Sequence, residues 1–302
     1  FPEEEMAREK NVIIEEISMN EDTPDDLCLD LLSEAYYGRE GYGRNILGTR
    51  ENVLGFTGAD VDRYMKARYT SDNIVISMAG NISVQLAEEL AEKYFGGLPA
   101  THADKRVIGV SARHRSLVKH KDIEQVHIAL AWPSVTRDDR LYDAVRIMNS
   151  VLGGSMSSRL FQEVREKLGL AYTVYSYNSA YADTGTLVVY AGVNAKNYLR
   201  SVDAVKKCID DVKGGKIGRE EFERGREQLK ASSIFAQEST SSQMLLYGKE
   251  MLYSGKPYSF EERIAAINAV TADDLAEAIE GSFNNDGMAA SLVGKLDKPL
   301  VI

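Results

Sequence analysis

The stretch FTGADVDRYMKARYTSDNIVISMAGNI, residues 56–82, recurs near the end of the chain as VTADDLAEAIEGSFNNDGMAASLVGKL, residues 270–296. The two stretches align without a gap. Each has a threonine at the expected cap, then apolar residues at helical spacing, a polar turn, and a predicted β-strand that ends at glycine. The residues that meet in the alignment include Thr57/Thr271, Asp60/Asp274, Tyr69/Phe283, Ser77/Ser291 and Gly80/Gly294. The alignment predicts two copies of one α/β unit.

A second match pairs FPEEEMAREKNVI, residues 1–13, with IGREEFERGREQL, residues 217–229. The two matches occur in the same order and at nearly the same offset, and a two-residue indel in the loop around SGKPYS accounts for the difference. The second copy would begin near Arg113. By the same offset, roughly 100 residues of the first copy are expected to be absent from the front of the chain.

The predicted division is therefore residues 1–112 as the rear part of a first half and residues 113–302 as a second half. The second half alternates strands and helices, which predicts an α+β fold with sheet and helices in two layers per half. The predicted elements are a strand at 126–132, helices at 137–154 and 157–169, a hairpin with strands at 171–181 and 185–193, and helices at 197–215 and from 218 onward.

The overall composition excludes several classes of function. The chain has 302 residues, a formal net charge of −10 and a pI near 5.1, with no block of Lys and Arg, so nucleic acid and anionic membrane are not expected partners. Neither an 18-residue apolar run nor a secretion signal is present, which favours a cytoplasmic location. Cys28 and Cys208 lie in apolar helical patterns and are predicted to be buried thiols in a reducing compartment.

Common site motifs are absent from the sequence. There is no GxGxxG, P-loop, CxxC or GxSxG. The histidines, His102, His114, His120 and His127, include no pair at i, i+4, so the sequence contains no two-histidine zinc motif.

Two pairs of residues at a spacing of seven remain as candidates. Glu9 and Glu16 lie two turns apart on one predicted helix face, where a solvated surface is the simpler interpretation. Arg165 lies late in a predicted helix and Tyr172 just beyond its terminal Gly169, where an ion pair for Arg165 and sheet packing for Tyr172 are the structural alternatives.

The segment SRLFQEVREKLGLAYTVYSY, residues 158–177, closely resembles the second-half signature of the pitrilysin/insulinase type of zinc metallopeptidases, above all in VREKLGLAY. This family includes the mitochondrial processing peptidase and small bacterial processing proteases. VIIEEISMNEDTPDD, GYGRNILGT and YTSDNIVISMAGNI resemble its first half. The resemblance covers essentially the whole chain.

The resemblance implies two homologous halves that face each other across a chamber. It also implies a zinc ion held by an HxxEH helix and a downstream glutamate. Glu16 matches the downstream ligand, and Glu9 matches a supporting catalytic carboxylate. The second copy has Gly225 and Ser232 at the matching positions, which favours a functional role for Glu16. The HxxEH motif is not in the sequence and is expected in the absent front part, so the zinc ligands are incomplete.

Arg165 and Tyr172 match family residues that contact the peptide backbone near the scissile bond, where their donors suit a developing oxyanion. The predicted function is a zinc-dependent endopeptidase, with this chain inactive alone. The alternatives are a non-catalytic family member that binds substrate as a partner subunit, and a peptide-binding module. Expected partners are peptide substrates and either an identical copy or a paired family subunit.

Overall fold

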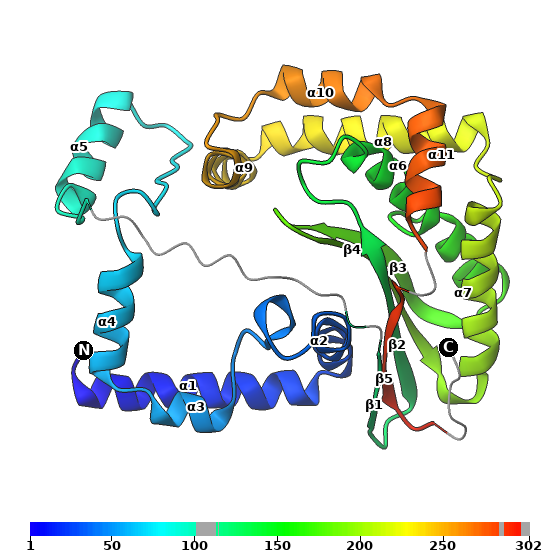
Figure 1. The fold of residues 1–302 in the computed structure, drawn as a ribbon, viewed down its shortest axis with the longest axis horizontal. Coiled ribbons are helices and arrows are strands. Elements are labelled where there is room, and N and C mark those ends of the chain that lie inside the picture. Colours follow the sequence, from blue (N-terminus) through cyan, green and yellow to red (C-terminus); the bar gives the residue numbers. More distant parts are fainter. Residues whose placement is uncertain (101–112, 114, 284–286, 297–302) are drawn as a thin grey trace. The chain divides into compact units, whose positions relative to one another are not determined.

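The computed structural model of the chain describes residues 1–100, 113, 115–283 and 287–296. Helices predominate and are accompanied by one five-stranded sheet, which confirms the predicted α+β class (Figure 1). The α-helices are α1 (Glu3–Asp22), α2 (Pro24–Tyr37), α3 (Arg50–Gly55), α4 (Gly58–Arg68), α5 (Val84–Phe95), α6 (Tyr142–Leu152), α7 (Tyr198–Lys213), α8 (Arg219–Glu238), α9 (Thr240–Ser254), α10 (Phe260–Ala269) and α11 (Ala272–Gly281).

The remaining elements are strands and short helices. The strands are β1 (Ser116–His120), β2 (Gln125–Ser134), β3 (Ala171–Ala180), β4 (Gly185–Asn194) and β5 (Ala289–Gly294). The segments η1 (Gly41–Gly43) and η3 (Ala195–Asn197) are 3₁₀ turns, and η2 (Phe161–Lys167) is a π-helix. The predicted strand at 126–132 and the predicted hairpin are both confirmed.

Two compact units make up the chain, and each combines segments that are distant in sequence. Unit 1 comprises Phe1–Ile14, Thr49–Val107 and Lys230–Ala265, and unit 2 comprises Glu15–Gly48, Ile108–Leu229 and Ala266–Ile302. The predicted boundary between halves, at residue 112, lies outside the described residues, so the division into 1–112 and 113–302 stays a prediction.

Unit 2 contains the sheet, whose strand order is β1-β5-β2-β4-β3. β1 and β5 are parallel, and the other neighbours are antiparallel. Successive residues of β2 face opposite sides, as the two-residue repeat of a strand requires. Ile128 and Leu130 belong to the core shared with α6, α7 and α11, whereas Ala129 and Ala131 pack with α2. Figure 1 shows α2 on one side of the sheet and these three helices on the other. The sheet of unit 2 is therefore covered by helices on both faces.

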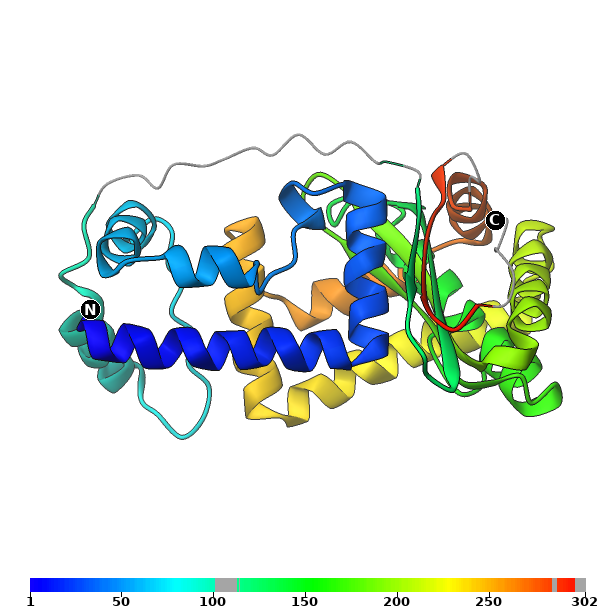
Figure 2. The same cartoon turned by 90° about the horizontal axis from the view of Figure 1, so that it is seen from below.

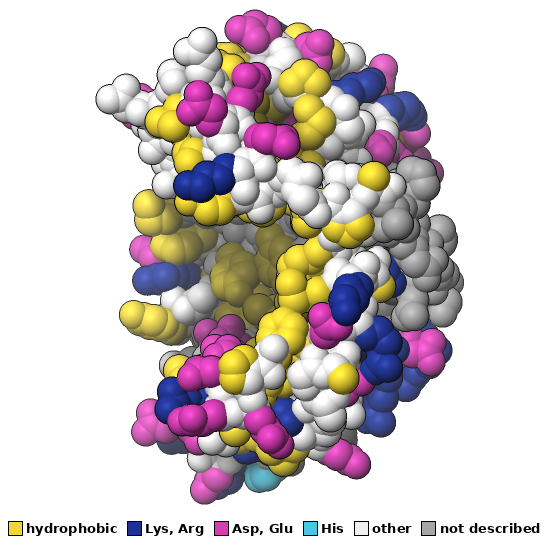
Figure 3. All heavy atoms as spheres, turned by 90° about the vertical axis from the view of Figure 1, so that its left-hand side faces the viewer, with side chains coloured by type: hydrophobic (Ala, Val, Ile, Leu, Met, Phe, Trp, Pro, Cys, Tyr) yellow, Lys and Arg dark blue, Asp and Glu magenta, His cyan; other side chains and the backbone are white. Residues whose placement is uncertain are grey.

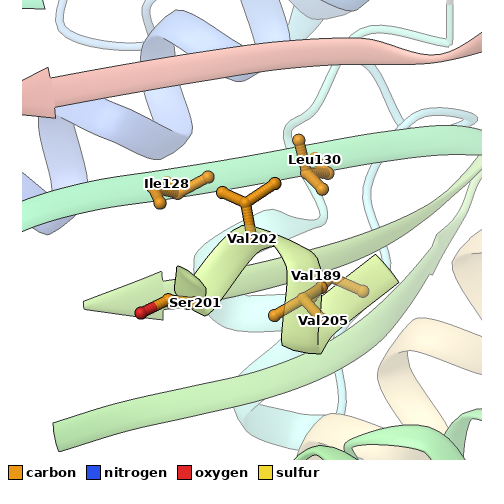
Figure 4. Close-up of a pocket in the computed structure, with 7 residues that line it drawn as sticks. Ile128, Leu130, Val189, Ser201, Val202 and Val205 are labelled. Atoms are coloured by element: carbon orange, nitrogen blue, oxygen red, sulfur yellow. The ribbon is translucent and has the colours of Figure 1, made fainter. Parts of the chain in front are cut away.

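A small cavity of about 10 Å³ lies inside this core, between β2, β4 and α7. Figure 4 shows Val202 of α7 pointing toward Ile128 and Leu130 of β2. The one hydroxyl in its lining, on Ser201, donates to the backbone oxygen of Asn197. Since a water needs several polar partners, the cavity is a packing gap of the core and not a ligand site.

The predicted repeat appears as matching secondary-structure elements in the two copies. α1 and α8 have the same length of 20 residues, and their ends match each other at the offset found in the sequence. α4 and α11 each begin with a capping box, formed by Thr57 with Asp60 and by Thr271 with Asp274. Gly80 and Gly294, which align in sequence, have φ values of 144° and 143°. Local structure therefore repeats with the sequence.

One part of the repeat is wrong. The sequence predicts a strand before Gly80 to match β5, but residues 73–79 form no strand. β5 lies between β1 and β2 and hydrogen-bonds with both. No described strand lies beside residues 73–79, and a strand without a partner is not stable in water.

A corresponding hydrogen bond nevertheless forms in each unit. In unit 2 the hydroxyl of Ser291 donates to the backbone oxygen of Cys28 at 2.6 Å, which joins β5 to α2. In unit 1 the hydroxyl of Ser77 donates to the backbone oxygen of Met244 at 2.7 Å, which joins residues 73–79 to α9. Ser77 aligns with Ser291, and Cys28 is related to Met244 by the same offset that relates α1 to α8. Residues 73–79 thus contact a helix at the position that the repeat predicts.

Unit 1 is far less densely packed than unit 2. Of its described residues only Val53 and Thr70 are buried. Its helices expose large hydrophobic side chains, among them Tyr64, Tyr94 and Phe235. Figure 3 shows hydrophobic side chains at the surface among acidic and basic ones, with no broad region of one charge sign on the face in view. The buried core that can hold a site rigidly lies in unit 2.

Candidate functional site

The helix that carries Arg165 departs from α-helical geometry. A helix was predicted at 157–169, and residues 161–167 form the π-helix η2, in which the N–H of Leu168 donates to the oxygen of Glu163 at 3.1 Å. Leu160 and Val164 are fully buried and anchor the helix to the core. Gly169, with φ of 58°, ends it as predicted. π-helices are rare and occur often at functional sites.

The strand that carries Tyr172 is also irregular. The ladder pairs Ala171 with Val193 and Thr173 with Gly192, so Tyr172 is an extra residue with no partner on β4. Such a β-bulge redirects a side chain and is over-represented near active sites. The Tyr172 side chain is 73% exposed. The predicted alternative, that Tyr172 packs in the sheet, is therefore wrong.

These two irregular elements bring Arg165 and Tyr172 together. The Arg165 guanidinium carbon lies 5.4 Å from the centre of the Tyr172 ring and 4.9 Å from that of Phe161. Both distances are within the range of a cation–π contact. The predicted alternative of an ion pair for Arg165 is confirmed, because Glu166 Oε1 lies 3.8 Å from Arg165 Nε. No hydrogen bond from the guanidinium reaches another described residue, so its N–H donors are available to a ligand.

A half-buried ion pair fixes the start of this helical region. Arg159 Nε and Nη2 donate to the two carboxylate oxygens of Glu221 at 2.9 Å and 2.6 Å. Glu221 in turn accepts from the N–H of Gly218 at the beginning of α8. The hydrogen bond from Arg159 lowers the pKa of Glu221, and the same contact raises the pKa of Arg159. This bidentate hydrogen bonding connects the segment before η2 to α8.

Glu9 and Glu16 both lie on α1, which is one continuous helix (Figure 2). Seven residues correspond to almost two full turns, so the two carboxylates project from nearly the same face. Both are exposed, and neither forms a hydrogen bond or ion pair with any part of the chain that the structure describes. No such contact links Glu16 to Arg165 or Tyr172 either. The resemblance implies that Arg165 and Tyr172 act near the Glu16 ligand, and this stays a prediction.

The described residues do not form a zinc site. Within the described ranges, no group of three His, Cys, Asp or Glu side chains is placed to hold a metal ion. His120 is exposed on β1, and His127 Nδ1 lies 2.6 Å from the Tyr190 hydroxyl, where burial lowers the histidine pKa. His102 and His114 lie outside the described residues. Glu16 alone offers one ligand where catalytic zinc uses three protein ligands.

Both cysteines are free and buried, as predicted. Burial raises the pKa of Cys28 to about 12 and that of Cys208 to about 11. Burial thus disfavours the reactive thiolate form of both cysteines.

Sequence reasoning missed three features of the site: the π-helix, the β-bulge and the stacking of Phe161 on Arg165. The spacing of four residues between Phe161 and Arg165 was an available signal, because residues at i and i+4 on a helix are neighbours. A bulge has no comparable signal, since it depends on the register with another strand.

Comparisons with known proteins show the family to which the chain belongs. A family profile described as the peptidase M16 inactive domain matches residues 55–229. The chain belongs to the M16 peptidase family, which confirms the resemblance found in its sequence.

No described helix is long and apolar enough to cross a membrane.

The relatives are named as zinc proteases. An uncharacterized zinc protease of Bacillus subtilis, YmxG, is 40% identical over 287 residues, covering 95% of this chain and 70% of the relative. An uncharacterized zinc protease of Streptomyces coelicolor is 35% identical over 284 residues, covering 90% of this chain and 61% of the relative. The chain thus spans only part of the length of each of these relatives.

Solved structures share the fold. The peptidase M16 inactive domain from Pseudomonas fluorescens superimposes with a TM-score of 0.89 at 24% identity, over 100% of this chain and 73% of that one. A protease from Helicobacter pylori gives a TM-score of 0.83 at 19% identity, over 99% of this chain and 73% of that one.

Proposed function

We propose that this chain is the peptide-binding part of a zinc-dependent endopeptidase. The observation that carries the proposal is the Arg165–Tyr172 pair, which a π-helix and a β-bulge together present to solvent. Both irregularities interrupt regular hydrogen bonding, and the core beneath them is well packed. Local irregularity over a rigid scaffold is typical of functional sites.

The chemistry of the pair suits a peptide backbone. Arginine presents several N–H donors in a fixed plane, and tyrosine adds a neutral O–H donor. Both can donate to a carbonyl oxygen and bind it more strongly as negative charge develops there. β3 is an edge strand, so an extended peptide can add beside its start, although the Ser176 N–H already donates to Gly153.

The zinc part of the proposal rests on Glu16 as one ligand and Glu9 as a supporting carboxylate. The names of the relatives support zinc, but the described residues alone do not fit the ion. We therefore propose that the other zinc ligands lie outside this sequence and that the chain alone does not hydrolyse peptides. A cytoplasmic location remains part of the proposal.

A second candidate is a non-catalytic substrate-binding subunit that pairs with an active family member or with an identical copy. The match to a profile described as an inactive domain favours it, as does the absence of a three-ligand metal group among the described residues. A peptide-binding module that needs no catalytic partner would use the same Arg165–Tyr172 pair.

All of these candidate functions require that the chain binds peptides, and fluorescence anisotropy with labelled, unstructured peptides tests this. The chain should bind them, and Tyr172→Phe and Arg165→Lys should each weaken binding, whereas Tyr64→Phe on α4 is a matched control. Equal affinities for all four proteins would contradict the site. Zinc-dependent cleavage by the product of the complete reading frame would then support the endopeptidase, and binding without cleavage would support the partner subunit.

A further inference from the structure

The Arg165 guanidinium lies between two aromatic rings that come from different elements. Phe161 is in η2 with its ring centre 4.9 Å away, and Tyr172 is in the bulge of β3 at 5.4 Å. The structure assigns Phe161 a positioning role: its ring holds the Arg165 guanidinium in the place where it can donate to a peptide carbonyl. The peptide part of this inference rests on the proposed function, whereas the positioning itself does not.

Phe161 is suited to that role because it is held more firmly than the other ring. It is half-buried, and it lies next to the fully buried Leu160, whereas Tyr172 is 73% exposed. Phenylalanine also has no hydroxyl that could bind a carbonyl. Phe161 therefore acts through Arg165, while Tyr172 both contacts Arg165 and offers a donor.

Arg165 needs such a support because little else restrains it. Among the described residues its one ionic neighbour is Glu166, at 3.8 Å from Nε, and the side chain is 39% exposed. A long side chain without fixed contacts samples many rotamers, and that freedom is lost when a ligand binds. Without the Phe161 ring, only the exposed Tyr172 ring and the Glu166 carboxylate would restrain the guanidinium, and it would less often be placed to donate to a peptide carbonyl.

The local geometry supports this interpretation. Arg165 follows Phe161 by four residues, a spacing that brings side chains together on a helix. The N–H of Leu170 donates to the oxygen of Val164 at 2.9 Å, which folds the chain back after Gly169 and brings Tyr172 beside Arg165. Two separate backbone features thus place two rings against the same cation.

The test uses the full chain and two substitutions at one position. Phe161→Leu removes the ring and keeps an apolar side chain, and Phe161→Tyr keeps the ring. The first measurement is the NMR resonance of the Arg165 Nε–Hε group, assigned by its loss in Arg165→Lys. Stacked rings shift this resonance upfield. Phe161→Leu should move it toward the position of an unstacked arginine, and Phe161→Tyr should leave it near the wild-type position.

The second measurement is affinity for the labelled peptides. Phe161→Leu should weaken peptide binding about two- to fivefold, the range that corresponds to one partly exposed cation–π contact. Phe161→Tyr keeps the ring and should bind peptides with nearly wild-type affinity. Phe235→Leu makes the same substitution at an exposed position on α8 and is the control, which should leave peptide affinity unchanged. An unchanged Nε–Hε resonance in Phe161→Leu overturns the positioning role. A shifted resonance with no peptide binding by the wild-type chain supports the positioning and contradicts the proposed function instead.

Discussion

The guanidinium of Arg165 lies 5.4 Å from the centre of the Tyr172 ring, although the two side chains come from a helix and a strand with Gly169 between them. Neither the Tyr172 hydroxyl nor the Arg165 guanidinium has a hydrogen-bond partner among the described residues, and the tyrosine is largely exposed. The donors of both side chains are therefore free to bind a ligand, as the proposed function requires.

Tyr172→Phe should separate function from stability. The ring and its contact with Arg165 remain, so the free energy of unfolding should change by less than about 0.5 kcal/mol, as for other exposed positions. In the proposed endopeptidase, loss of one donor to the oxyanion should lower turnover roughly a hundred- to a thousandfold. Urea unfolding and peptide hydrolysis by the product of the complete reading frame measure the two effects. Wild-type turnover in this variant would remove Tyr172 from the catalytic site.

The chain on its own should retain no zinc. Glu16 supplies a single carboxylate, and the part of the chain that the structure describes holds no three-residue metal group. After dialysis against a mild chelator, metal analysis should find far less than one zinc per chain, and Glu16→Gln should change nothing further. Stoichiometric zinc in the wild-type chain would show that the metal site has been misplaced.

The Arg159–Glu221 pair should make stability depend on pH. The hydrogen bond from Arg159 lowers the pKa of Glu221 below the ordinary 4.5, so this stabilisation is present above pH 4.5 and is lost as the pH falls through the lowered value. Glu221→Gln should cost about 1–3 kcal/mol at pH 7, since it weakens a half-buried charged pair. The difference from wild type, measured by urea unfolding, should shrink as the pH falls below 4.5. Glu220→Gln in the same helical turn is the control, and a pH-independent difference would exclude the ion pair as its cause.

The two aligned serines should differ in their contribution to stability. Ser291 is fully buried and donates to the Cys28 oxygen, so Ser291→Ala should cost about 1–3 kcal/mol. Ser77 is only half-buried, so water can replace its bond to Met244, and Ser77→Ala should cost less than about 1 kcal/mol. Chemical denaturation of the two variants compares them directly. A larger loss from Ser77→Ala would mean that the hydrogen bond in unit 1 is the more important one.

The residues of the candidate site could be chosen from the sequence, but their arrangement in space could not be predicted from it. The spacing of Arg165, Gly169 and Tyr172 follows from the chain alone, as does the helix stop at Gly169. The exposure of Tyr172 depends on how β3 aligns with β4, where Thr173 opposes Gly192 and leaves Tyr172 without a partner. Register between strands is set by side chains distant in sequence, so a single segment does not reveal a bulge.

The sequence by itself determined the features that depend on neighbouring residues. The capping boxes at Thr57 and Thr271 form because the aspartate three positions on reaches back to the threonine, and Gly80 and Gly294 adopt nearly the same φ in both copies. Only the tertiary structure decided that β5 is a strand while residues 73–79 are not. A strand is completed by hydrogen bonds to other strands, and β5 has β1 and β2 beside it, whereas no described strand flanks the aligned segment.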